Sequence, residues 1–246
     1  METSRHKHQL DLLIYPLRPW LKCHTEDGYV GGNMFLYFSL AQVRNQDFRG
    51  PDVFVVLGVP YRERKSWVVW EEGKGPDIVI ELLSDKTAAR DKGEKKRIYQ
   101  DQVRVAEYYW FDPFDPDDWA GFALREGRYE PIVPDEQGRL VSKRLGLALV
   151  RWYGLYEDAE TTWLRWATLD GDYYPLLRSR WNWNGSGRRL NDNAPKSKLN
   201  APTSKLNAPK SKPNAPTSKL NAPTSKLNAL PPRKRKSPGY RHCWPL

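Results

Sequence analysis

The amino-acid sequence predicts an α/β (α+β) fold with a β-rich C-terminal extension. Two observations support this fold class. Several short apolar runs have the length and the β-branched or aromatic composition of strands, and Gly, Pro or Asp residues bound them. One proline-free stretch with the composition of a helix lies between two of these runs. Runs of strands interrupted by a helix in this way are typical of mixed α and β domains.

Four apolar runs are predicted to form the strands of the sheet. Each is rich in β-branched or aromatic residues and is too short for a helix of ordinary length. We expect the second and third runs to lie beside each other. The runs are Asn33–Leu40, Asp52–Gly58, Asp77–Leu83 and Ala106–Asp112.

The stretch Thr87–Gln102 is predicted to form the main helix of the chain. It contains Ala88, Ala89 and Ile98 among alternating charges, and it has no proline. A hydroxyl side chain just before it, at Ser84 or at Thr87 itself, is expected to cap the first turn.

A β-rich extension is expected after Pro113. A hairpin candidate joins Gly121–Leu124 to Arg128–Val133, and the strand-like segment Leu145–Tyr156 leads to a Trp-rich stretch that ends near Tyr174. We therefore expect one folded domain over residues 1–184.

Residues 185–246 are predicted to form a disordered, basic, low-complexity tail. From about Asn191 the sequence repeats with a period of seven residues, and each unit contains a proline. These prolines exclude a helical coiled coil, and the repeat offers little apolar surface to bury. The prolines are Pro202, Pro209, Pro216 and Pro223.

The positive charge of the chain belongs to this tail. The whole chain has 40 Lys and Arg against 30 Asp and Glu, for a net charge of +10. Residues 185–246 hold 14 Lys and Arg against the single acid Asp192, whereas residues 1–184 hold 26 against 29. Composition alone therefore does not make the folded part a nucleic-acid binder. The basic stretch at 231–237 either contacts phosphates without sequence preference or is only a solvated tail.

Cysteine content and hydropathy indicate a cytoplasmic protein without a membrane segment. The two cysteines, Cys23 and Cys243, lie far apart and cannot build a framework of several disulfides. The longest apolar runs are far shorter than the ~20 residues that a membrane-spanning helix needs.

Two predicted strands each contain an acidic residue where an apolar one is expected. Glu81 lies inside Asp77–Leu83, and Asp52 begins Asp52–Gly58. A buried carboxylate is costly unless a partner compensates it. Two carboxylates at adjoining strand ends and one backbone carbonyl are sufficient ligands for Mg²⁺, which retains several waters. Asp52 and Glu81 are therefore predicted metal ligands.

The helix adds a candidate ammonium group at Lys95. Lys95 follows Asp91 by four residues and precedes Tyr99 by four, so the three side chains share one helical face. If the helix turns back over the preceding strand, Lys95 can orient an attacking water or stabilise charge that develops on a phosphate. The alternative is a structural ion pair between Glu81 and Lys95 or Arg90, and the spacing leaves both interpretations open.

Four sequence blocks in this region together resemble a known family. They are GPDVFVV from Gly50, GPDIVIELLS from Gly75, DKGEKKRIY from Asp91 and AEYYWFD from Ala106. As a series they are similar to the Uma-type family of putative restriction endonucleases, within the PD-(D/E)XK nuclease superfamily. The resemblance covers roughly residues 30–170. It implies a restriction-endonuclease-like core, in which a mixed β-sheet flanked by helices presents a metal site at strand ends.

The resemblance also assigns roles to individual residues. It places the two metal ligands of the superfamily on Asp52 and Glu81, and it implies Mg²⁺ as the cofactor, for which Mn²⁺ can substitute. The superfamily's lysine would fall on Leu83, which cannot act in its place, whereas Lys95 matches a lysine that has moved to the following helix. Asp91 and Tyr99 are expected to support these three catalytic residues.

Two functions follow from these assignments. The first is a Mg²⁺-dependent endonuclease that hydrolyses phosphodiester bonds of DNA, with DNA as its partner and a homodimer as its assembly. The second is a nuclease-fold protein that has lost catalysis and acts as a DNA-binding or interaction module. Leu83 favours the second function, as does the segment Asp27–Asn33, which has no acid or glutamine that clearly matches the first-helix carboxylate of the superfamily.

Overall fold

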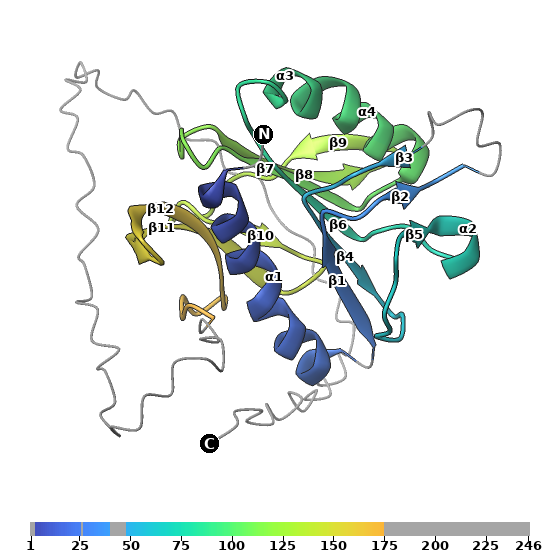
Figure 1. Cartoon of the computed structure of the whole chain (residues 1–246), viewed down its shortest axis with the longest axis horizontal. Coiled ribbons are helices and arrows are strands. Elements are labelled where there is room, and N and C mark those ends of the chain that lie inside the picture. The colour runs from blue at the N-terminus through green and yellow to red at the C-terminus, as the bar shows by residue number, and fades with distance from the viewer. Residues whose placement is uncertain (1–2, 26, 40–47, 175–246) are drawn as a thin grey trace, which may run out of the picture. The chain divides into compact units, whose positions relative to one another are not determined.

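The computed structural model describes residues 3–25, 27–39 and 48–174, which belong to one compact unit built around a β-sheet (Figure 1). The predicted tail, residues 185–246, lies outside the described residues, and so does the predicted domain boundary at residue 184.

The described chain begins with a helix, continues mainly as strands, and contains one longer helical stretch between two strands of the central sheet. The strands and the first two helices are α1 (Ser4–His24), β1 (Gly28–Gly32), β2 (Leu36–Tyr37), β3 (Phe48–Arg49), β4 (Val53–Leu57), β5 (Trp67–Val68), α2 (Val69–Glu72), β6 (Ile78–Leu82), β7 (Glu107–Phe111), β8 (Trp119–Arg125), β9 (Arg128–Pro131), β10 (Leu140–Ser142), β11 (Leu147–Tyr156) and β12 (Ala159–Ala167). One continuous helical stretch between β6 and β7 consists of α3 (Ala88–Arg90), the π-helical segment η1 (Asp91–Lys95), α4 (Lys96–Ile98) and the π-helical segment η2 (Tyr99–Val103).

The central sheet is mixed, as the family resemblance implies. Its strand order is β1-β4-β6-β7-β8-β9, and all neighbours are antiparallel except β6 and β7. Parallel neighbours need a long crossover connection, and the helical stretch 88–103 provides it. Two smaller three-stranded sheets, β10-β11-β12 and β3-β2-β5, complete the described strands.

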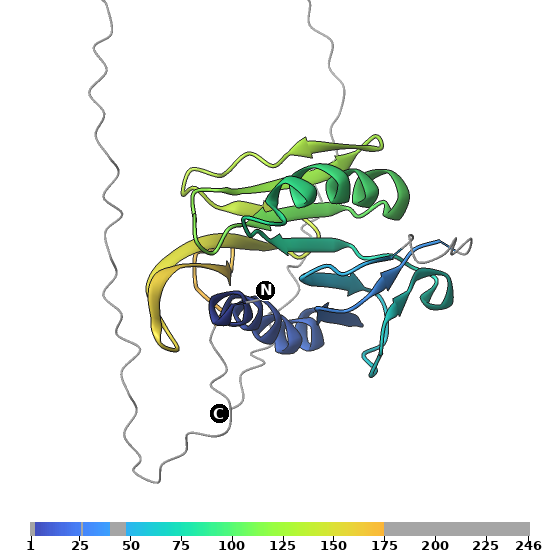
Figure 2. The ribbon, with the colours of Figure 1, turned by 45° about the horizontal axis from the view of Figure 1, so that its top comes forward.

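The two faces of the central sheet are covered by different elements. Ile78, Ile80 and Leu82 of β6 belong to a core that includes α1 and the β10–β12 sheet. Val79 belongs to a second core with Tyr99 and other aromatic residues. Figure 2 shows α1 and the helical stretch 88–103 on different sides of β6. Because side chains alternate along a strand, Glu81 faces the helical stretch.

The helix α1 was not predicted from the sequence. Pro16 and Pro19 lie inside it, and an internal proline ordinarily removes a helical hydrogen bond at a cost of about 3 kcal/mol. Tertiary contacts outweigh this cost. The apolar side of α1 is buried, including Leu13 and Leu17, and the Trp166 indole of β12 donates a 3.0 Å hydrogen bond to the Leu13 carbonyl.

The strand prediction for Asn33–Leu40 was wrong in extent. Within that run only Leu36–Tyr37 forms a strand among the described residues, whereas the glycine-rich segment Gly28–Gly32 forms β1 beside β4. Close approach explains the glycine at position 32, because a Cβ there would lie 2.5 Å from the Asp52 carbonyl oxygen. Glycine lowers strand propensity, so pattern alone did not reveal β1.

The remaining predicted elements are confirmed with small shifts of their ends. The three other strand runs become β4, β6 and β7, the hairpin becomes β8–β9, and the β-rich extension becomes β10–β12. Thr87 is the N-cap of α3, but its side chain makes no capping hydrogen bond. None of the described helices has the length and apolarity to cross a membrane.

Candidate active site

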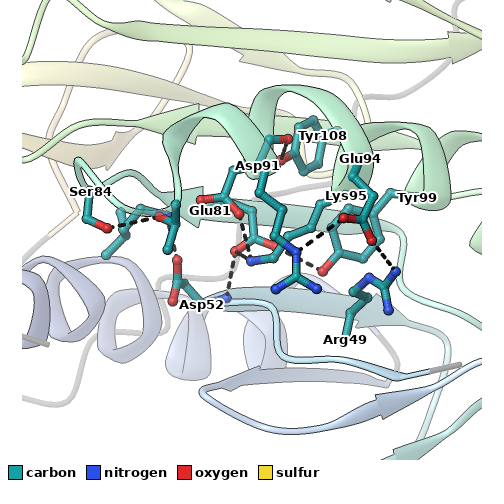
Figure 3. A network of polar contacts seen from close by, with 12 residues as sticks. Arg49, Asp52, Glu81, Ser84, Asp91, Glu94, Lys95, Tyr99 and Tyr108 are labelled. Carbon is teal, nitrogen blue, oxygen red and sulfur yellow. Dashed lines mark hydrogen bonds and ion pairs between the residues drawn. The ribbon is translucent and has the colours of Figure 1, made fainter. Parts of the chain in front are cut away.

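Asp52 and Glu81 meet at one edge of the central sheet. The antiparallel register pairs Val53 with Ile80, so Asp52, which immediately precedes β4, lies opposite Glu81 in β6. One Asp52 oxygen, Oδ2, accepts a 2.7 Å hydrogen bond from the Leu82 N–H, and the Asp52 N–H donates to Glu81 Oε2 at 3.4 Å (Figure 3). The structure therefore places the two predicted ligands side by side.

The helical stretch 88–103 brings three further side chains to this carboxylate pair. The Lys95 ammonium lies 3.1 Å from Glu81 Oε2 and 2.8 Å from Asp91 Oδ1. The Tyr99 hydroxyl donates a 2.9 Å hydrogen bond to the other Glu81 oxygen, Oε1. The Tyr108 hydroxyl of β7 donates a 2.8 Å hydrogen bond to the Asp91 carbonyl and so connects the helical stretch to the sheet. The shared helical face expected from the sequence thus turns back over β6.

Burial dominates the electrostatics of the site. Glu81 is 0% exposed, and burial together with the Asp52 charge raises the pKa of Glu81 to about 8 despite the nearby Lys95. Burial also raises the pKa of Asp52, although the Leu82 N–H and Lys95 oppose the shift. For Lys95, burial lowers the pKa, but the Glu81 and Asp91 carboxylates outweigh it and raise the pKa overall. Lys95 therefore remains a cation.

The structural ion-pair alternative is resolved in part. Lys95 pairs with Glu81, whereas Arg90 pairs with Glu94 at 3.5 Å. The Lys95 ammonium nevertheless serves two carboxylates, Glu81 and Asp91, and Asp52 adds a third acidic group beside Glu81. A second positive charge would stabilise all three carboxylates.

The residues present fit a hard divalent cation. Asp52 and Glu81 offer oxygen ligands, and burial, which raises the pKa of both groups, makes their charged forms costly unless a cation lies close to them. Within the described ranges, no group of three or more His, Cys, Asp and Glu side chains is arranged to hold a metal ion. A cation here would complete its ligands with a backbone carbonyl and water, as Mg²⁺ commonly does.

Leu83, where the resemblance would place a lysine, directly follows β6. Leu83 is fully buried, and its N–H donates to the Phe111 carbonyl at 2.8 Å. Its own carbonyl forms a 2.9 Å hydrogen bond with Nε2 of His6 in α1. Sequence analysis missed His6, because no local pattern connects it with a strand 77 residues away.

Gln9, on the first helix, has a structural role. Its side chain donates to the Leu164 carbonyl at 2.8 Å and accepts from the Leu164 N–H at 2.9 Å. Both ends of its amide therefore join α1 to β12. Gln9 does not supply the first-helix group that the superfamily resemblance leads one to expect.

Comparison with known proteins identifies the family. A family model described as "Uma2: Putative restriction endonuclease" matches residues 1–154. The chain belongs to the Uma2 family. This membership confirms the resemblance of the four sequence blocks, and the match also includes α1.

Among solved structures, this Uma2 chain is similar to that of a putative nuclease belonging to DUF820 from Anabaena variabilis ATCC 29413. The two share 15% sequence identity with a TM-score of 0.40, and the alignment covers 56% of this chain and 72% of the other. The search of curated proteins gives no match.

Proposed function

We propose that this Uma2 protein is a Mg²⁺-dependent endonuclease that hydrolyses phosphodiester bonds of DNA. The observation that carries the proposal is the cluster formed by Asp52, Glu81 and Lys95, in which the half-buried Asp52 lies beside the buried Glu81 and the Lys95 ammonium pairs with Glu81. Family membership supports a nuclease, and the oxygen-rich, electron-rich donor set supports Mg²⁺ or Mn²⁺ as the cofactor.

Asp52 and Glu81 would hold the cation. When bound, it supplies Lewis-acid stabilisation of the charge on the phosphate under attack. The hydrogen bonds from Leu82 N–H to Asp52 and from Tyr99 to Glu81 fix the two carboxylates before substrate arrives. Such preorganisation lowers the reorganisation needed during reaction.

Lys95 is the proposed charge-stabilising group. Its salt bridge to Asp91 holds the ammonium beside Glu81, where it can orient the attacking water and stabilise negative charge on phosphate oxygens. Asp91 and Tyr99 are positioning residues, because each acts on the substrate through Lys95 or Glu81. Because the buried Leu83 occupies the position where the superfamily has its lysine, Lys95 is the lysine that we propose for that role.

The first test is DNA cleavage by wild type and by Lys95→Ala with Mg²⁺ or Mn²⁺. Loss of one positioned charge-stabilising group should reduce the cleavage rate by a factor of about 10² to 10⁴. Lys96→Met is the matched control, since the Lys96 ammonium lies 3.3 Å from the centre of the Phe122 ring and methionine retains most of that packing. Equal rates for all three proteins would remove Lys95 from the mechanism.

The second candidate function is a DNA-binding or interaction module without catalysis. The buried Leu83 at the lysine position favours it. If the wild type binds DNA but cleaves none with Mg²⁺ or Mn²⁺, the module is the correct assignment. The homodimer stays a prediction that analytical ultracentrifugation can test.

A further inference from the structure

Two arginines share one carboxylate next to the candidate active site. Arg49 of β3 donates to Glu94 Oε1 at 2.8 Å, and Arg90 lies 3.5 Å from Glu94 Oε2. We call Arg49 and Arg90 the arginine pair, and the two arginines together with Glu94 the cluster. No step of the proposed hydrolysis uses them.

The position of this cluster connects it with the catalytic residues. Glu94 directly precedes Lys95 in η1, and Arg49 precedes Asp52 by three residues. Figure 3 shows Arg49 and Glu94 beside Lys95 and Tyr99. A polymer bound across Asp52 and Glu81 therefore passes close to the cluster.

The cluster combines one fixed cation with an accessible surface. The Arg49 side chain is only 12% exposed, and it donates a 2.7 Å hydrogen bond to the Phe48 carbonyl, so its guanidinium is held in place. The side chains of Glu94 and Arg90 are 56% and 57% exposed. A ligand that takes the place of the exposed Glu94 carboxylate can therefore contact both arginines.

Charge balance shows why a DNA strand needs such a group here. The candidate active site contains three carboxylates and one ammonium, and residues 1–184 as a whole carry more acids than bases. Before a divalent cation binds, acidic groups of this kind repel a polyanion, and cations at the flanks of the site add attraction for it. Guanidinium groups bind phosphate and carboxylate oxygens with the same forked geometry.

We propose that Arg49 and Arg90 bind a DNA backbone phosphate next to the scissile one, and that Glu94 occupies this position in the free protein. The inference rests on DNA as the substrate of the proposed function and names the contact that holds it. Binding exchanges the Glu94 carboxylate for a phosphate, so Glu94 weakens DNA binding while it keeps the two arginines aligned.

The test compares Glu94→Gln with Glu130→Gln in the full chain. Glu130 of β9 pairs with Arg125 of β8 at 3.4 Å, and their side chains are 58% and 56% exposed. The pair lies beside the β8–β9 turn, and β9 is the edge strand at the other end of the strand order from β1. Both variants remove one negative charge. Binding of a fluorescent DNA duplex is measured by anisotropy with Ca²⁺ over a range of salt concentrations. Glu94→Gln should tighten binding about 3- to 10-fold, and Glu130→Gln less than 2-fold.

The arginine variants give the converse result. Arg90→Ala should weaken binding at least about 3-fold and reduce the salt slope by about one, whereas Arg125→Ala should have a smaller effect. Arg49→Lys retains the charge but loses the fork, and it too should weaken binding. Thermal melting of each variant verifies that it is folded.

The outcomes separate this inference from the proposed function. If Glu94→Gln matches Glu130→Gln and Arg90→Ala matches Arg125→Ala, the inference is wrong even where the wild type cleaves DNA. If the variants show the expected binding but the wild type cleaves no DNA, the phosphate contact stands and the endonuclease assignment fails. A wild type that binds no duplex overturns both.

Discussion

Glu81 is a carboxylate inside an apolar strand, and its neighbours decide its charge. Three donors contact it, namely the Asp52 N–H, the Lys95 ammonium and the Tyr99 hydroxyl. Burial and the Asp52 carboxylate nevertheless favour its protonated form. A buried carboxylate whose charged form is energetically costly without a nearby cation, and stable with one, is better suited to bind a metal ion than to form a purely structural ion pair.

Neutralising either predicted ligand should abolish metal binding and stabilise the metal-free protein. Asp52→Asn or Glu81→Gln retains the shape of the side chain, removes a required ligand charge and relieves carboxylate repulsion. We expect Mn²⁺ affinity to fall at least about 100-fold by calorimetric titration, while the melting temperature in EDTA rises. Unchanged Mn²⁺ affinity in both variants would contradict the assignment.

Asp77→Asn provides the matched control, because Asp77 follows the second Gly-Pro pair of the sequence. Burial alone would raise the pKa of Asp77, but hydrogen bonds from Lys74, the Leu57 N–H and Arg144 outweigh it and lower the pKa. Asp77 directly precedes β6, whereas Asp52 lies opposite Glu81 near the other end of that strand. Asp77→Asn should therefore lower stability by about 1–3 kcal/mol without changing Mn²⁺ affinity.

Without metal, the free energy of unfolding should fall as pH rises from about 5 to 8. The unfolded chain releases the Glu81 proton near pH 4.5, whereas the native protein retains it until about pH 8. Between these values the native state binds more protons, so Glu81 contributes a loss of about 1.4 kcal/mol per pH unit. Denaturant titrations in EDTA measure this slope, which should be smaller in Glu81→Gln. Identical slopes would show that Glu81 does not hold a proton.

At the scale of elements, the site depends on how closely two strands and one helix approach. Lys95 and Asp91 belong to η1, and Tyr99 begins η2. Gly32 of β1 packs against the Asp52 backbone, and the N–H of the next residue, Asn33, donates a 3.1 Å hydrogen bond to the Asp52 carbonyl. The backbone of β1 thus helps to set the geometry of Asp52, although β1 contributes no side chain to the candidate site.

Gly32→Ala should disturb the site through the backbone. The added Cβ would lie 2.5 Å from the Asp52 carbonyl oxygen and 2.6 Å from Cδ1 of Ile14, and the backbone contact cannot yield cheaply. We expect a stability loss of about 1–3 kcal/mol and weaker Mn²⁺ binding. Gly93→Ala is the control, since nothing lies within 4 Å of its added Cβ and alanine favours a helix by about 1 kcal/mol. A folded Gly32→Ala with normal Mn²⁺ affinity would show that β1 does not position Asp52.

At the scale of the whole molecule, charge is divided between two parts of the chain. Residues 1–184 have a small excess of acids, whereas residues 185–246 hold 14 Lys and Arg against one acid. Specific contacts of the folded part and non-specific attraction by the basic part are therefore separable by truncation.

Removing residues 185–246 should weaken DNA binding and reduce its salt dependence. Each cationic side chain that contacts a phosphate releases a counterion, and most of the cationic excess lies in the removed segment. The melting temperature of the remaining chain should change little, because the repeat has few apolar side chains to bury. Anisotropy titrations at several salt concentrations and a melting curve check both parts. Unfolding of the truncated chain would show that the segment packs on the domain.

The sequence by itself determined the features that depend on neighbours along the chain. Short apolar runs of β-branched or aromatic residues located β4, β6 and β7, and the four-residue spacing placed Asp91, Lys95 and Tyr99 on one helical face. The acids Asp52 and Glu81 stood out because they interrupt apolar strands. These signals depend on residues close together in the sequence, so they can be recognised before the fold is known.

Only the tertiary structure decided the features that depend on contacts between distant segments. α1 forms despite two prolines because β12 and the central sheet bury it. β1 contains a glycine at position 32 because its backbone packs there too closely against Asp52 to leave room for a side chain. The bonds from His6 to Leu83 and from Arg49 to Glu94 span 77 and 45 residues. Pair interactions of this kind leave no periodic trace in the sequence, because the energy that selects each partner exists only after the chain has folded.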